Sequence, residues 1–159
     1  MAKGKKRWSL PLFLVASMAC IVLGCRSSVN VKPDRSDFVT YRFGGGEAGA
    51  DFTEITIRGD GTVTYGYHFP LTERDVLTRK AVLSPAETKN LFQDLANAGL
   101  FGLKSDRMGG ADLDWADIRA QVDNRRVEAK YIGRFEGLTE VRRLFFPLLK
   151  KMHPERWGR

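Results

Sequence analysis

Residues 53–69, TEITIRGDGTVTYGYHF, decide the fold of this chain. Residues 53–58 and 62–69 alternate between apolar and polar side chains, and Gly59-Asp60-Gly61 separates the two runs. Alternation with a period of two is typical of a β-strand with one buried face, and a short Gly/Asp segment between two such runs predicts a β-hairpin. The residues expected on the buried face of this hairpin are Ile55, Ile57, Val63, Tyr65, Tyr67 and Phe69.

Further strand patterns lie on both sides of the hairpin. Before it, residues 38–43 alternate in the same way, and after it residues 76–83 predict another strand. Downstream, residues 116–122 and 127–131 also alternate. Asp123-Asn124 lies between these two runs and is typical of a tight turn. We therefore expect a second hairpin here.

A helix is predicted to begin after Ser84. The Ser84 side chain can accept a backbone hydrogen bond, Pro85 suits the first helical position, and Glu87 completes a capping box. This helix should end near Ala98, because Gly99 is a favourable residue just after a helix C-terminus.

A second helix is predicted over residues 138–152, where apolar side chains recur at helical spacing. Pro147 lacks a backbone N–H and should kink or split this helix near Phe146. The order strands, helix, hairpin, helix predicts an α+β domain, in which an antiparallel sheet built from hairpins has two helices packed on one face.

The N-terminal residues have the order of a secretory signal peptide. A basic start, residues 3–7, precedes residues 10–23, which contain no charged side chain. This apolar run is shorter than the roughly 20 residues of a transmembrane helix and fits the ~7–15 residues of a signal peptide. Val22-Leu23-Gly24-Cys25 follows and resembles the lipobox of bacterial lipoproteins. Cys20 is a second candidate for the modified cysteine.

The resemblance to bacterial lipoproteins implies that residues 1–24 are removed and that Cys25 becomes an acylated N-terminus. Residues 25–36 would then hold the lipidated cysteine and a flexible tether, and residues 37–159 a single domain in the cell envelope, outside the cytoplasm. Arg26 differs from the Asp of an inner-membrane retention signal used in some bacteria, which favours the outer membrane if the host has one. The alternatives are an uncleaved anchor and a plain secretory signal.

The charge and cysteine content limit the classes of function. The chain carries a net charge of +7, but four of the positive charges lie in residues 1–24, so that +3 remain on the mature chain. This small excess gives no reason to expect nucleic acid as a partner. Both cysteines, Cys20 and Cys25, lie in the N-terminal region, and we therefore expect no disulfide or thiol chemistry in the domain.

Acidic residues crowd one short segment that contains Asp106, Asp112, Asp114 and Asp117, and residues 104–114 of it are expected to form a loop. Calcium prefers oxygen ligands from such a loop, with Asp112, Asp114 and Asp117 as the candidates, although their spacing differs from the known calcium loop. Paired carboxylates could also catalyse hydrolysis. The alternative is a solvated loop. Because no nucleophile-elbow, P-loop or dinucleotide-binding motif occurs, we expect no catalytic residue and no cofactor.

The C-terminal segment, residues 142–159, is the most asymmetric in charge, with six basic residues against Glu155 alone. Four of its basic residues form the candidate partner surface: Arg142, Arg143, Lys150 and Lys151. This surface could contact an envelope protein or an anionic surface such as lipid headgroups. The alternative is the ordinary solvated face of an amphipathic helix.

Much of the domain is also similar to a family of uncharacterised bacterial exported domains. The similarity rests on IRGDGTVTY (57–65), LSPAE (83–87), LANAGLFGL (95–103), the strand led by Asp114, and the closing Trp157. The family implies the same fold and no known activity.

Together these patterns predict a membrane-anchored envelope lipoprotein, held by its lipid, whose domain is a non-enzymatic interaction or accessory module. The alternative is an exported protein that binds a small ligand or calcium. A carboxylate-based hydrolase acting on cell-wall material is a third hypothesis.

Overall fold

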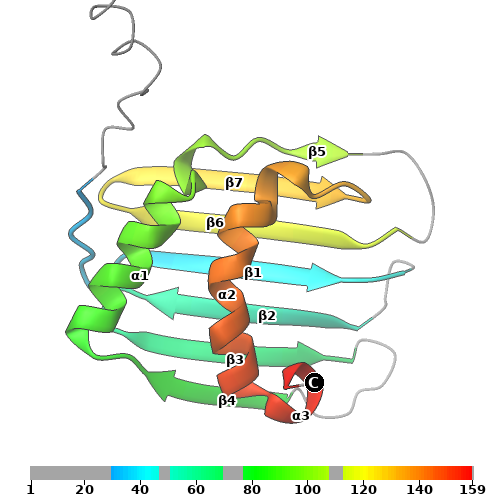
Figure 1. Cartoon of the computed structure of the whole chain (residues 1–159), viewed down its shortest axis with the longest axis horizontal. Coiled ribbons are helices and arrows are strands. Elements are labelled where there is room, and N and C mark those ends of the chain that lie inside the picture. Colours follow the sequence, from blue (N-terminus) through cyan, green and yellow to red (C-terminus); the bar gives the residue numbers. More distant parts are fainter. Residues whose placement is uncertain (1–29, 47–50, 70–76, 108–112, 159) are drawn as a thin grey trace, which may run out of the picture.

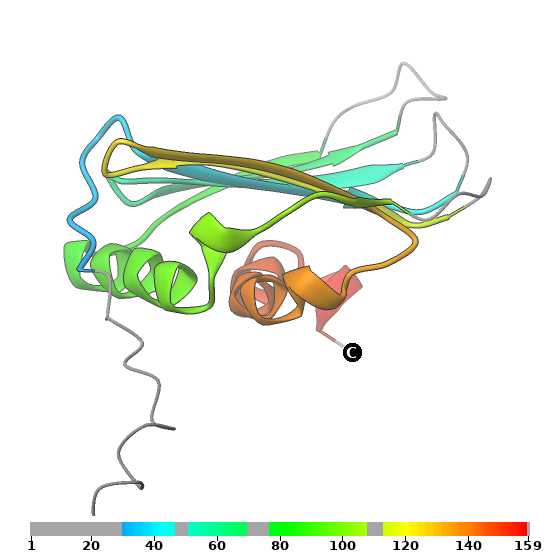
Figure 2. The ribbon, with the colours of Figure 1, turned by 90° about the horizontal axis from the view of Figure 1, so that it is seen from above.

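The computed structural model describes residues 30–46, 51–69, 77–107 and 113–158. In these ranges seven strands form one sheet, and helices pack on one of its faces (Figure 1) (Figure 2). The strands are β1 Phe38–Gly44, β2 Phe52–Arg58, β3 Thr62–His68, β4 Leu77–Val82, β5 Asp106–Arg107, β6 Trp115–Val122 and β7 Arg125–Ile132. The helices are α1 Pro85–Asn97, α2 Thr139–Met152 and α3 Pro154–Trp157. The predicted α+β fold, with α1 and α2 on one face of a hairpin-built sheet, is confirmed.

Strand β1 lies at the centre of the sheet. The strand order is β4-β3-β2-β1-β6-β7-β5, so that β1 pairs antiparallel with β2 on one side and with β6 on the other. Both predicted hairpins are present, and the turn of the second has positive φ angles of 52° at Asp123 and 62° at Asn124. One pairing was not expected. Strand β5, within the predicted loop 104–114, pairs parallel with β7, a partner distant in the sequence.

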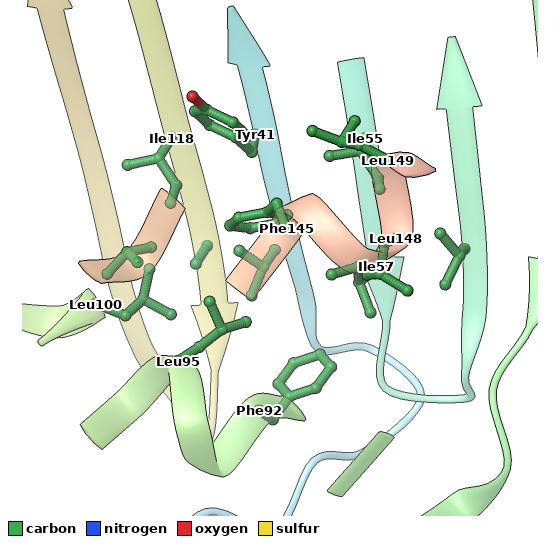
Figure 3. Packing of buried hydrophobic residues seen from close by; sticks show 14 of the residues in the cluster. Tyr41, Ile55, Ile57, Phe92, Leu95, Leu100, Ile118, Phe145, Leu148 and Leu149 are labelled. Carbon is green, nitrogen blue, oxygen red and sulfur yellow. The ribbon is translucent and has the colours of Figure 1, made fainter. Parts of the chain in front are cut away.

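The face of the sheet under the helices holds the hydrophobic core. Tyr41 of β1 pairs with Ile55 of β2 and with Ile118 of β6, and all three residues are buried. Figure 3 shows these side chains facing Phe145 of α2, with Leu95 of α1 beside them. The ring centroids of Tyr41 and Phe145 are 4.9 Å apart. The core is therefore closed by contacts between the central strand and both helices.

The first hairpin follows its predicted alternation with one exception. Five of the six residues expected on its inner face are buried. Phe69 is 39% exposed, so its predicted burial is wrong. The reason is its position, because β3 ends at His68 and Phe69 follows the strand. Its ring instead packs edge-on against Tyr67, with the centroids 4.3 Å apart.

Helix α1 begins as predicted. The Glu87 N–H donates to Ser84 Oγ at 3.2 Å, and the Ser84 N–H donates to Glu87 Oε2 at 2.7 Å, which together form the capping box. Pro85 occupies the first position of the helix. Just beyond the helix, Gly99 has a φ of 93°, a conformation that glycine adopts without strain.

Helix α2 continues through Pro147 and is not split at Phe146. Pro147 lies on the exposed side of the helix, where the carbonyl that loses its N–H partner can bind water. The buried positions of α2 are Val141, Phe145, Leu148, Leu149 and Met152. The break comes after Met152, at His153, and α3 then begins with Pro154.

The segment before β1 is part of the folded domain from Val31 onward. Val31 is 0% exposed, and its N–H donates to Gln93 Oε1 of α1 at 3.1 Å. The buried Asp37 carboxylate accepts the N–H of Asp123, in the β6–β7 turn, at 3.2 Å. Residues 31–36, expected in the flexible tether, are therefore held by the domain. The sequence did not predict this, because local composition carries no sign of these distant partners.

Removal of the Phe145 ring tests the core. We expect Phe145→Ala to lower the free energy of unfolding by about 3–5 kcal/mol, the usual cost of deleting a buried phenylalanine ring. Phe146→Ala, on the exposed side of the same helix, is the matched control and should change it by about 0.5 kcal/mol or less. Urea denaturation measures both, and equal losses in the two variants would contradict the packing described.

Candidate functional site

A cleft of about 520 Å³ lies between the helices α2 and α3 and the ends of β1, β2 and β6. Its aromatic lining comes from Tyr41, Phe43, Trp115, Phe135 and Trp157. Its charged lining comes from Arg142, Arg156, Asp51 and Asp114. Clefts of this size commonly hold small molecules or short segments of a partner. The cleft is therefore the candidate functional site.

Glycines at the end of β1, where it lines the cleft, let neighbouring residues approach the backbone closely. A Cβ on Gly44 would lie 2.7 Å from the Asp51 carbonyl oxygen and 3.1 Å from Trp115 Nε1. A Cβ on Gly45 would lie 2.6 Å from Asp114 Oδ1. The contact with the Asp51 carbonyl is too short for a real Cβ, so that glycine at position 44 allows β2 to approach the end of β1 this closely.

Aromatic rings from the sheet and from α3 pack together along the cleft. The rings of Tyr41 and Phe43 stack with centroids 4.9 Å apart, and Trp157 meets Phe43 edge-on at 5.5 Å. Burial raises the pKa of Tyr41 to about 12, although the nearby charge of Arg142 acts in the opposite direction. Tyr41 is thus protonated at neutral pH and contributes an apolar ring to the cleft rather than a base.

Two arginines of the cleft, Arg142 and Arg156, have no ion pair with any described residue. Arg142 lies over the rings of Phe135 and Phe146, at 5.8 and 5.6 Å from their centroids. Arg156 lies over Tyr67 at 4.1 Å and over Trp157 at 5.5 Å. By contrast, the neighbouring Arg143 pairs with Glu140 at 3.0 Å, outside the cleft. Stacked guanidinium groups without a carboxylate partner are suited to bind a carboxylate or phosphate.

The cleft carboxylates have different surroundings. Asp51 Oδ2 accepts a hydrogen bond from the Tyr67 hydroxyl. Burial raises the pKa of Tyr67, and this bond to Asp51 acts in the same direction. Asp114 lies at the start of β6, and its carbonyl accepts the N–H of Gly133 at 2.8 Å. Asp51 is therefore already engaged, whereas Asp114 lines the cleft beside Gly45.

The predicted acidic cluster is not brought together. Asp117 alternates with Ala116 and Ile118 on β6, so that it lies on the open face of the sheet, 3.4 Å from Arg119 and away from the cleft. Asp114 lines the cleft, and Asp112 lies outside the described residues. Within the described ranges, no three His, Cys, Asp or Glu side chains are placed to hold one metal ion. The crowding in sequence therefore does not become a shared site for Asp114 and Asp117.

The predicted basic surface is divided between two environments. Arg142 lines the cleft, whereas Arg143, Lys150 and Lys151 are exposed on the outer side of α2. Arg156 joins Arg142 at the cleft although the sequence did not single it out. Arg156 belongs to the basic segment 142–159, and the break at His153, before Pro154, is the local signal that the chain turns between Arg142 and Arg156. Cys25 lies outside the described residues.

A chain of polar side chains that runs from the buried Tyr65 to the surface lies beside the cleft. The Tyr65 hydroxyl and His153 Nδ1 are 2.7 Å apart, and His153 Nε2 lies 3.3 Å from Glu155 Oε1. Arg79 of β4 binds Glu155 and donates to the Met152 carbonyl at 2.8 Å. Tyr65 is 0% exposed, so that a substrate has no access to its hydroxyl. The chain therefore fastens the end of α2 and the start of α3 to the sheet.

The titration of His153 tests this fastening. Burial lowers the pKa of His153 below 6.5; Glu155 opposes this shift, and Arg79 and Arg156 add to it. The unfolded chain binds the proton more readily, so the free energy of unfolding falls as the pH drops below about 6.5. We expect a smaller fall in melting temperature from about pH 7.5 to about pH 5 in His153→Gln than in the wild type. His68→Gln is the control, and an unchanged pH profile in His153→Gln would contradict the role of His153.

No protein-family model matches the chain, and no curated protein sequence matches it. Among the described residues, no helix is long and apolar enough to cross a membrane. The resemblances to bacterial lipoproteins and to a family of uncharacterised exported domains therefore stay predictions.

Proposed function

We propose that this protein is an envelope lipoprotein, anchored through acylated Cys25, whose domain is a non-enzymatic binding module. The observation that carries the proposal is the cleft in which Arg142 and Arg156 lie over aromatic rings without an ion-pair partner among the described residues. In this proposal the domain lies outside the cytoplasm. The residue after the cysteine, Arg26, favours the outer membrane in a host that has one.

The chemistry of the cleft supports binding. Guanidinium groups and aromatic rings hold and orient a ligand, and Tyr41 remains protonated with a pKa of about 12. A ligand that fits has a carboxylate or phosphate beside a planar or apolar group, because the arginines bind the first and the rings contact the second. A segment of another envelope protein has this chemistry where an acidic residue adjoins an aromatic one.

The second candidate function is binding of a small molecule by the exported domain. The volume of about 520 Å³ favours it, since pockets for small ligands are commonly ~300–1,000 Å³. The two candidates share the same arginines and differ in what occupies the cleft. Crosslinked partner protein supports the first, and a stabilising small molecule without a partner protein supports the second.

The anchor is tested by fractionation of cells. We expect the wild-type protein in the membrane fraction and Cys25→Ala in the soluble fraction, because loss of the acyl chains removes the hydrophobic attachment. Immunoblotting of the two fractions measures the distribution. Cys20→Ala is the matched control and should stay with the membrane. A soluble wild-type protein would contradict the anchor.

The binding site is tested by substituting the two cleft arginines, Arg142 on α2 and Arg156 on α3, with Arg143 as the control. We expect Arg142→Gln and Arg156→Gln each to lower the yield of a crosslinked partner by about tenfold or more, as expected for the loss of one charge-assisted contact of about 1.5–3 kcal/mol. Arg143→Gln, next to Arg142 but paired with Glu140, should keep the yield of the wild type. In-cell crosslinking followed by pull-down measures this yield. Equal effects of all three substitutions would reject the cleft as the site.

A further inference from the structure

We infer that the outer side of α2 lies against the anionic surface of the membrane that holds the lipid anchor. The contact surface, here called the α2 stripe, consists of Phe146, Pro147, Lys150 and Lys151, all of them exposed. The inference rests on the proposed anchor at Cys25, and it adds an orientation: the helix layer faces the membrane and the open face of the sheet faces away.

The interval between the proposed anchor and the domain is short. Val31 is buried against the domain and bonded to α1 through Gln93, so that an interval of six residues separates the proposed anchor at Cys25 from the domain. Six residues span at most about 20 Å when fully extended. The anchored domain therefore stays close to the membrane surface, and its orientation depends on where the tether enters.

The tether reaches the domain on the side of the helix layer. Figure 2 shows the chain from residue 30 starting at the level of α1 and then rising past the sheet to β1. An orientation with the open sheet face on the membrane would require the tether to pass the helix layer, and a helix is about 10 Å across. Roughly half of the available length would be used in that way. The helix layer is therefore the side that a short tether brings to the membrane.

The α2 stripe combines an exposed aromatic ring with basic side chains. Phe146 is one of three large apolar side chains exposed in the described part of the chain, with 36% of its surface accessible. Lys150 follows it by four residues, so that an unpaired cation lies next to the ring along one side of the helix, and Lys151 lies one residue further. Basic residues around an exposed aromatic ring are typical of a helix lying at a lipid interface.

The open face of the sheet also carries cations, and those on its central strands are paired with carboxylates, whereas Lys80 on the edge strand β4 has no ion pair with a described residue. Arg42 lies 3.3 Å from Glu54, and Arg119 lies 3.4 Å from Asp117. Lys150 and Lys151 on α2 have no such ion pair with any residue the structure describes. Helix α1, in the same layer, exposes Glu87 and Asp94 beside Lys89. The net attraction to anionic headgroups is therefore greater on α2.

The experiment uses the lipidated protein in vesicles of phosphatidylglycerol and phosphatidylethanolamine, with a fluorophore on a single introduced cysteine. Pro147→Cys places the label within the α2 stripe without removing a cation or Phe146. Thr78→Cys is the matched control, because Thr78 is exposed on the open face of the sheet, level with Gly66 and Glu54. Nitroxide lipids labelled on the headgroup quench a fluorophore that lies at the membrane surface.

We expect quenching at position 147 and constant intensity at position 78. Lys150→Glu with Lys151→Glu should reduce the quenching at position 147, whereas Lys80→Glu on the open sheet face should not. Equal quenching at both positions, or none at either, in vesicle-bound protein would overturn the orientation and leave the anchor intact. Wild-type protein that does not associate with the vesicles would overturn the anchor, and the orientation with it.

Discussion

The rest of the structure depends on the burial of one face of the sheet around Tyr41 of the central strand. Tyr41 has Ile55 and Ile118 as its neighbours in β2 and β6, and the ring of Phe145 closes this layer from α2. No disulfide is available to the domain, because both cysteines lie in the N-terminal region. Apolar burial therefore has to offset the conformational entropy lost on folding.

The same packing produces the candidate site. Helices α1 and α2 cover the sheet, while the ends of β1, β2 and β6 beside α2 contribute a hollow that Gly44 and Gly45 help to line. The contact between His153 and Tyr65 holds the turn that follows α2. Helix α3 begins after this turn, and its Arg156 lines the cleft. The site is thus a consequence of how the last helices are held to the core, and a change in that attachment alters the cleft.

Local patterns predicted the two hairpins and α1, because alternation in residues 53–69 and the capping box at Ser84 depend on neighbours in the sequence. Contacts between distant segments were beyond such patterns. These include the pairing of β5 with β7 and the attachment of Val31 to α1. The acidic segment is a different case, because the alternation that turns Asp117 away from the face of Ala116 and Ile118 is a local pattern already present in the sequence. Of the candidate site, Arg142 was found from its basic segment, whereas Arg156 and the aromatic lining required the fold.

The account's central claim is that a binding domain is held close to a membrane by a lipid on Cys25. Mass spectrometry of the N-terminal peptide of the protein isolated from its native cells tests it most directly. The predicted result is a peptide that begins at Cys25 and carries the mass of acyl chains. A peptide that retains residues before Cys25, or one that begins there without added mass, would contradict the claim.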